Sequence, residues 1–200
     1  MQQRTDEWFN ARIGKITASR VKDIDAKPKS GKALNSVLLM VLAERLTGIQ
    51  SQGFVNTAMQ WGIDNEPNAV EAYEWQNFTK VEPCGLIDHP TIEMAGASPD
   101  GLVGDDGQIE IKCPNTETHL NTIITGKIPS EYLPQITWQL ACTGRDWCDF
   151  VSYDPRLEPK LQIHIIRVYR DDLDIAGLEQ KVIQANEIIN EHLEKIKGKL

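Results

Sequence analysis

Three residues near the middle of the sequence, Asp100, Glu110 and Lys112, could together bind a metal ion and act on a phosphate. Asp100 lies near the far end of one expected strand of a hairpin. Glu110 and Lys112 are two residues apart on the other strand, so they point to the same face. Two carboxylates and the backbone carbonyl of Ile111 are the hard oxygen ligands that Mg²⁺ or Mn²⁺ prefers. The lysine could position a water molecule or neutralise charge on a reacting phosphate, which indicates a metal-dependent phosphodiesterase. An ion pair on the face of an ordinary hairpin is the alternative.

Helices are expected to fill most of the sequence before this hairpin. They cover residues 5–13, a short stretch after Thr17 or Ser19, residues 35–48 and residues 57–78. Thr5 and Asn35 are good N-terminal caps, and Gly48 is a typical end of a helix. Pro67 interrupts the last pattern, so we expect a kink there or the first residue of a new helix.

The sequence from residue 80 onward alternates between strand-like and helix-like stretches. The expected strands cover 80–88, 93–103, 108–113, 147–153 and 161–170, and the expected helices cover 116–126, 130–143 and 171–197. Asp105-Asp106-Gly107 is a hairpin turn signal, and Asp171 with Asp172 suits the start of the last helix. This order predicts an α/β (α+β) fold with a mixed central sheet flanked by helices.

The composition of the 200 residues is that of an ordinary globular chain, with 40% apolar and 25% charged residues. The longest uninterrupted apolar run is 37–43, too short to span a bilayer, and the first residues lack the apolar stretch of a secretory signal. The four cysteines form no CxxC pair, which argues against a disulfide scaffold or a zinc site and favours a reducing cytoplasm.

The net charge of −8 is unevenly distributed. Residues 1–32 carry eight basic and four acidic side chains, whereas the rest of the chain carries 13 basic and 25 acidic ones. Salt limits charge effects to about 10 Å, so a basic arm on an acidic body can still meet phosphate locally. A solvated, charge-rich surface is the alternative explanation of this segment.

Several further motifs accompany the hairpin in a fixed order. They are Trp8 to Ser19 (W-x3-R-x-G-x2-T-A-S), Ala26 to Lys32, Trp61-Gly62 with Glu66, Ser98 to Leu102, Ile109 to Pro114, Tyr132 with Gln135, and Tyr153 to Arg156. The hairpin pattern resembles that of the PD-(D/E)xK nuclease superfamily. The whole series is similar to one of its branches, the phage λ exonuclease and YqaJ-type viral recombinase family. The resemblance implies a restriction-endonuclease-like core.

The resemblance also implies a role for individual catalytic residues. Asp100 and Glu110 would bind Mg²⁺, with Mn²⁺ as another option, and the Ile111 carbonyl would join them. Lys112 would orient and activate the attacking water. Two other residues would complete the catalytic group. Glu66 would add a carboxylate near a second metal position, and Gln135 would lie close to the metal-bound water or the scissile phosphate.

A second set of residues, Arg12, Ser19 and Ser98, matches family positions that hold a 5′-terminal phosphate. A guanidinium and two hydroxyls suit that task, although a surface ion pair, a helix cap and a turn would explain the same residues. Relatives in the wider superfamily often carry a tyrosine one helical turn after the glutamine, where this sequence has Gln139, so no role is assigned there. The four histidines, His89, His119, His164 and His192, show no ligand spacing and are interpreted as surface or strand residues.

The resemblance predicts a Mg²⁺-dependent 5′→3′ exonuclease that acts on double-stranded DNA ends, releases mononucleotides and leaves 3′ overhangs for recombination. It also implies a homotrimeric ring, a single-strand annealing partner and a phage or prophage source in a bacterial host. A restriction- or repair-type endonuclease and a non-catalytic DNA-end binding module are the alternatives. We expect one nuclease domain over 1–200, made of a basic arm (1–32), a helical part (33–79), a catalytic sheet with helices (80–170) and a C-terminal helix (171–200).

Overall fold

The computed structural model describes residues 1–51 and 56–199, so parts of the expected segments 33–79 and 171–200 lie outside the described residues. The α-helices are α1 (Asp6–Ala11), α2 (Ser36–Thr47), α3 (Thr57–Asn77), α4 (Thr116–Thr125), α5 (Leu133–Thr143) and α6 (Ile175–Lys197). The strands are β1 (Ile16–Thr17), β2 (Val81–Glu82), β3 (Ile87–Asp88), β4 (Ala95–Ala97), β5 (Gly101–Val103), β6 (Gly107–Lys112), β7 (Trp147–Tyr153) and β8 (Ile163–Tyr169). Short 3₁₀ turns cover Val21–Asp23, Ser130–Tyr132, Pro159–Leu161 and Arg170–Asp172.

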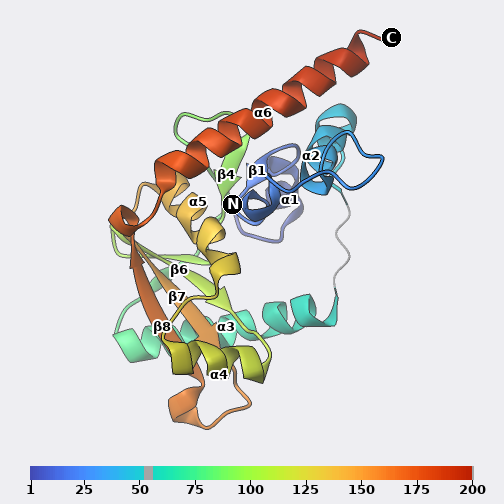
Figure 1. The fold of residues 1–200 in the computed structure, drawn as a ribbon. Coiled ribbons are helices and arrows are strands. Elements are labelled where there is room, and N and C mark those ends of the chain that lie inside the picture. Colours follow the sequence, from blue (N-terminus) through green and yellow to red (C-terminus); the bar gives the residue numbers. More distant parts are fainter. Residues whose placement is uncertain (52–55, 200) are drawn as a thin grey trace.

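The larger sheet has five strands in the order β2-β5-β6-β7-β8. Strands β6 and β7 are parallel and the other neighbours are antiparallel, so the sheet is mixed as expected. Helix α3 covers one face through Ala69 and Tyr73, and α5 covers the other through Ile136 and Leu140. Figure 1 shows the sheet held between these helices.

A smaller sheet of three strands, in the order β1-β4-β3, was not expected. The stretch 93–103 divides into β4 in the small sheet and β5 in the large one, and 80–88 divides likewise into β2 and β3. Pro83 and Pro99 lie in the two breaks, where a residue without a backbone N–H ends a strand. The prediction of a mixed sheet flanked by helices is confirmed, but each of these two stretches contributes to both sheets.

The small sheet packs with α2, α5 and α6 in the largest apolar core. Trp138 and Ala141 of α5 belong to this core, while Ile136 and Leu140 of the same helix belong to the core under the large sheet. Helix α5 therefore joins the two layers, and in Figure 1 it lies between α6 and the large sheet.

Several predicted helix boundaries are corrected by the structure. Thr17 lies in strand β1, and only a 3₁₀ turn follows Ser19. Helix α3 continues through Pro67, so no new helix begins there. The last helix begins at Ile175 because Asp174, rather than Asp171, caps it by accepting a hydrogen bond from Gly177 N.

The interpretation of all four histidines as surface or strand residues was wrong for two of them. His119 is completely buried in α4, where its ring nitrogens lie 2.7 Å from Ser152 Oγ and from the Leu161 carbonyl. His89 is buried against Trp138, with the rings stacked 5.0 Å apart. Hydrogen bonding and stacking satisfy these rings inside the fold.

Over the described residues, none of the helices combines the length and apolar character needed to cross a membrane.

Candidate active site

Asp100 and Glu110 lie side by side in the large sheet, Asp100 at the start of β5 and Glu110 within β6. Asp100 comes directly before β5, where its Oδ2 accepts a hydrogen bond of 2.7 Å from Ile111 N of β6. The alternation along β6 turns Ile109 and Ile111 toward α3 and turns Glu110 toward α5. Burial, followed by the negative charge of Glu110, raises the pKa of Asp100 well above its usual value. A second negative charge beside Glu110 is therefore unfavourable, and a cation would stabilise it.

Glu110 is almost completely buried, and side chains from α5 and β6 donate to both of its oxygens. Gln135 Nε2 donates to Oε1 at 2.6 Å, and Gln139 Nε2 donates to Oε2 at 2.5 Å. Lys112 Nζ also donates to Oε1. These donors fix the orientation of the carboxylate, which is required of a metal ligand.

Lys112 lies between the carboxylates and the aromatic ring of Tyr132. Its Nζ is 3.4 Å from Gln135 Oε1 and 5.2 Å from the centre of the Tyr132 ring. Burial lowers the pKa of Lys112, but the charges of Glu110 and Asp100 together raise it above its usual value. Lys112 is therefore an ammonium group beside the carboxylates.

Glu66 reaches the same groove from α3, and its carboxylate is paired with Arg4 at 2.5 Å. The groove has a volume of about 590 Å³. Its walls include side chains from the N-terminal segment, α3, β6 and α5, among them Arg4, Ser19, Glu66, Asp100, Glu110, Lys112, Tyr132 and Gln135. The structure thus brings together every catalytic residue that the sequence analysis named.

The donor set fits a hard divalent cation held by two carboxylates. Asp100 and Glu110 supply carboxylate oxygens, and the adjoining Ile111 carbonyl is of the same chemical class. Within residues 1–51 and 56–199, no group of three or more His, Cys, Asp or Glu side chains is arranged to hold a metal ion. Glu66 would have to leave Arg4 to become the third carboxylate.

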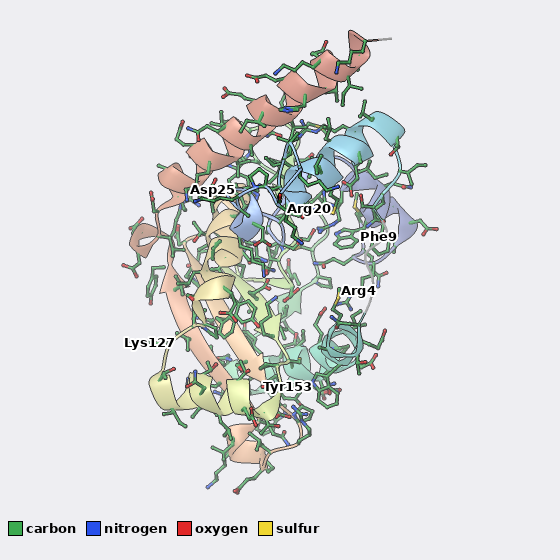
Figure 2. All side chains as sticks on the ribbon, turned by 45° about the vertical axis from the view of Figure 1, so that its right-hand side comes forward. Arg4, Phe9, Arg20, Asp25, Lys127 and Tyr153 are labelled. Atoms are coloured by element: carbon green, nitrogen blue, oxygen red, sulfur yellow. The ribbon has the colours of Figure 1, made fainter. Side chains whose placement is uncertain are left out.

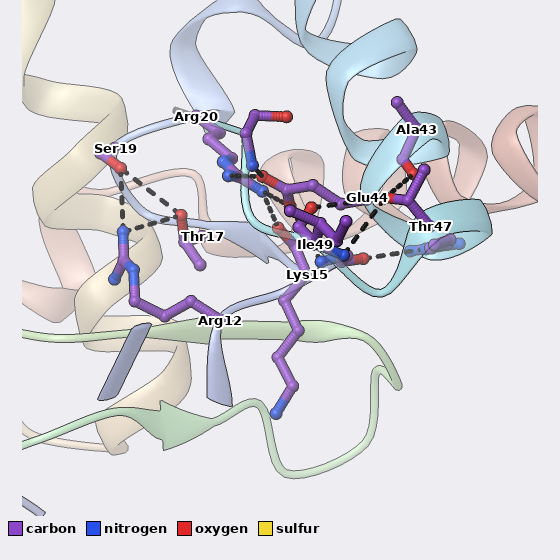
Figure 3. A network of polar contacts seen from close by, with 12 residues as sticks. Arg12, Lys15, Thr17, Ser19, Arg20, Ala43, Glu44, Thr47 and Ile49 are labelled. Atoms are coloured by element: carbon purple, nitrogen blue, oxygen red, sulfur yellow. Dashed lines mark hydrogen bonds and ion pairs between the residues drawn. The ribbon is translucent and has the colours of Figure 1, made fainter. Parts of the chain in front are cut away.

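Arg12, Ser19 and Ser98 also come together, although they are far apart in the sequence. Arg12 Nη1 lies 3.4 Å from Ser98 Oγ, and its Nη2 lies 3.4 Å from Ser19 Oγ and 3.3 Å from Thr17 Oγ1. Trp8 stacks on the guanidinium at 4.1 Å. Figure 3 shows Arg12 pointing toward Thr17 and Ser19. Three hydroxyls thus lie within hydrogen-bond distance of one guanidinium, and donors of this kind suit an anion.

The electrostatics around Arg12 favour a bound anion. Within the described part of the chain, Arg12 forms no ion pair with a carboxylate, whereas nearby Arg20 is paired with buried Glu44 at 2.7 Å. Figure 3 shows Arg12 near the Arg20–Glu44 pair. Burial and then the charge of Arg20 lower the pKa of Arg12 to about 10. An anion would relieve this repulsion.

Sequence analysis missed several contributors to these sites. Gln139, where relatives in the wider superfamily often carry tyrosine, holds Glu110. Its position four residues after Gln135 on α5 was a signal that both face β6. Thr17 lies in the T-A-S motif and adds a third hydroxyl beside Arg12. Trp8 fixes Ser98 by donating to Oγ at 2.9 Å. The pairing of Arg4 had no local sequence signal.

Comparisons with known proteins agree with this arrangement. The YqaJ-like viral recombinase domain matches residues 7–146. The structure of LHK-Exo in complex with dAMP is 49% identical, with a TM-score of 0.90, and the match covers 98% of this chain and 97% of that one. The alkaline exonuclease LHK-Exo from Laribacter hongkongensis is 48% identical in a second structure, with a TM-score of 0.88 and the same shares covered.

A more distant structure supports the fold alone. The phage-related exonuclease from Haemophilus somnus 129PT is 14% identical, with a TM-score of 0.64 over 92% of this chain and 96% of that one. No curated protein matches the chain. The extent of the domain match and the identity to LHK-Exo show that this chain is a nuclease and belongs to the family of YqaJ-like viral recombinase domains.

Proposed function

We propose that this chain is a Mg²⁺-dependent 5′→3′ exonuclease that digests double-stranded DNA from its ends, with residues 1–200 acting as one nuclease domain. The observation that carries the proposal is the position of two sites beside each other. One is the Arg12 site, made of Arg12, Thr17, Ser19 and Ser98. The other is the carboxylate groove that Glu66, Asp100 and Glu110 line. Ser98 belongs to the first and Asp100 to the second, so their Cα atoms are at most about 7.6 Å apart. Ser19 touches both sites.

The carboxylate groove would carry out the hydrolysis. Asp100, Glu110 and the Ile111 carbonyl would hold Mg²⁺, with Mn²⁺ as an alternative, and Glu66 would add a carboxylate. Bound there, the cation supplies charge stabilisation for the attacking and leaving oxygens. Lys112 would orient the attacking water and stabilise developing negative charge through its ammonium group.

Two glutamines of α5 would hold Glu110 and Lys112 in place. Gln135 bridges Lys112 and Glu110, because its Oε1 accepts from one and its Nε2 donates to the other. It would also lie near the water or the scissile phosphate. Gln139 would keep Glu110 aligned from the opposite oxygen.

The Arg12 site would set the polarity and the register of digestion. A 5′-phosphate held by Arg12, Ser19 and Ser98 would place the next phosphodiester at the carboxylates, since positioning of this kind lowers the barrier. Mononucleotides would then leave one at a time. LHK-Exo has been crystallised in complex with dAMP, which supports a mononucleotide product.

The remaining parts of the proposal concern assembly and setting. Three subunits would form a ring around the DNA, and a single-strand annealing protein would receive the 3′ overhang. The protein would be encoded by a phage or prophage and would act in the cytoplasm of a bacterial host. The exposed lysines of the loop 27–32 would offer positive charge to the duplex. Light scattering should give about three times 22.5 kDa, and a monomer at working concentration would exclude the ring.

The decisive experiment uses linear duplexes labelled at their ends, with a 5′-phosphate or a 5′-hydroxyl, and closed circular DNA as the control. We expect Mg²⁺-dependent release of mononucleotides from phosphorylated 5′ ends, and no cleavage of the circle. Cleavage of closed circles would instead identify an endonuclease of the restriction or repair type. End binding without hydrolysis in Mg²⁺ would identify a non-catalytic module.

A further inference from the structure

Arg4 extends from the N-terminal segment into the groove that holds the carboxylates. Its Nη2 lies 2.5 Å from Glu66 Oε2, and Figure 2 shows it beside α3. The Arg4 side chain is 42% exposed and that of Glu66 is 27% exposed. The pair is therefore open to solvent, and ions from solution can compete for either partner.

The neighbours of Arg4 hold its backbone in place. Gln3 Nε2 donates to the Pro99 carbonyl at 2.7 Å and to the Cys84 carbonyl at 3.0 Å. Thr5 caps α1 by accepting from Trp8 N. Arg4 itself has a φ of +64°, a conformation that is uncommon outside glycine. Because both neighbours are anchored, the chain keeps Arg4 directed at the groove.

The charges in the groove are arranged as two ion pairs and one further carboxylate. Lys112 is paired with Glu110, Arg4 is paired with Glu66, and Asp100 accepts only a backbone N–H among the described residues. These five side chains carry three formal negative and two formal positive charges. Removal of Arg4 would double the formal net negative charge that a cation meets.

We propose that Arg4 is a positioning residue that acts as an internal counter-cation of the metal site. It pairs with Glu66 while the groove is free of a divalent cation, and it must release that carboxylate before Glu66 can join Asp100 and Glu110. This inference rests on the proposed function, because it assumes that these carboxylates bind the cation. Its consequence is that Arg4 weakens cation binding to the DNA-free protein.

The test measures Mn²⁺ binding to the DNA-free protein from the paramagnetic resonance signal of free Mn²⁺. Arg4→Gln should bind Mn²⁺ roughly three- to tenfold more tightly than the unmutated protein, because one repelling charge and one competitor for Glu66 are gone. Arg4→Gly should do the same, and glycine suits the positive φ, so this second variant guards against misfolding.

Lys15→Gln is the matched control. Lys15 forms an ion pair of the same length with Asp88, 2.5 Å, and it lines a different pocket. Its loss changes the net charge equally, so unchanged Mn²⁺ affinity is expected. An unchanged or weaker affinity in both Arg4 variants would overturn this inference alone. If Asp100→Asn binds Mn²⁺ as tightly as the unmutated protein does, that result would instead contradict the proposed metal site.

Discussion

Substitution of Arg12 tests whether the hydroxyl-lined site holds a 5′-phosphate. Among the described residues, Arg12→Ala removes the only cationic side chain that lies within hydrogen-bond distance of the hydroxyls of Thr17, Ser19 and Ser98. A hydrogen bond to a charged group contributes about 1.5–3 kcal/mol, which corresponds to roughly ten- to hundredfold in rate for phosphorylated ends. Digestion of 5′-hydroxyl ends should change little, so the preference for phosphorylated ends should disappear.

Arg12→Lys gives a sharper version of this test because its effect depends on pH. Burial and the charge of Arg20 lower the pKa of Arg12 from 12.5 to about 10, so the guanidinium stays charged at pH 9. A lysine has an ordinary pKa of about 10.4, and the same burial and the same charge of Arg20 would lower that pKa too. The lysine variant should therefore keep part of the phosphate preference at pH 7 and lose it at pH 9.

The assay compares single-turnover digestion of phosphorylated and hydroxyl ends at pH 7 and pH 9 for the unmutated protein and both variants. The ratio of the two rates cancels any effect of pH on hydrolysis itself. A phosphate preference that persists in Arg12→Ala would refute the role of Arg12. A lysine variant with the same ratio at both pH values would refute the electrostatic argument.

Three further changes probe the groove and its support. Asp100→Asn should abolish hydrolysis in Mg²⁺ while end binding, measured by fluorescence anisotropy, stays largely intact. Lys112→Ala should lower the rate of single-turnover cleavage by on the order of a hundredfold or more, with DNA affinity little changed. Cleavage at the unmutated rate would show that Lys112 is only a surface charge without a part in hydrolysis. Glu44→Gln should cost about 3 kcal/mol in urea unfolding at pH 6.5, because buried Glu44 accepts from Arg20 and from Gly14 N. Burial alone would raise the pKa of Glu44, but the hydrogen bonds from Arg20 and Gly14 outweigh burial and lower that pKa. The stabilisation is therefore present above about pH 4.5 and is lost as the pH drops below that value. The difference in free energy of unfolding between the unmutated protein and Glu44→Gln should accordingly be smaller at pH 3.

Local patterns predicted the parts of the site that depend on neighbouring residues. Glu110 and Lys112 share a face because strand side chains alternate, and both meet the same groove. Asn35 and Gly48 bound α2 because a side-chain oxygen caps its first turn and a left-handed glycine ends it. The predicted hairpin turn at 105–107 is confirmed with a shift of one residue, because the turn covers 104–106 and Gly107 already begins β6.

Long-range packing decided what those patterns left open. Gln139 was set aside for lack of a phenol, yet its amide holds Glu110 because α5 lies across the strand. His119 is polar, and only the tertiary partners Ser152 and the Leu161 carbonyl make its burial possible. The grouping of Arg12, Ser19 and Ser98 came from family resemblance, since no spacing rule joins residues so far apart.

The segment 98–100 would let the two proposed sites, which are built on different sheets, act on one strand of DNA. Each of its residues is fixed by a different part of the chain. Ser98 Oγ accepts from Trp8, the Pro99 carbonyl accepts from Gln3, and Asp100 N donates to the Ile109 carbonyl at 3.2 Å. Because each residue of this segment is held by a hydrogen bond, the proposed phosphate site and the carboxylates would keep one separation. An enzyme that removes a fixed unit from a strand end needs such a constant separation, because a shift of about 1 Å in a reacting group is costly.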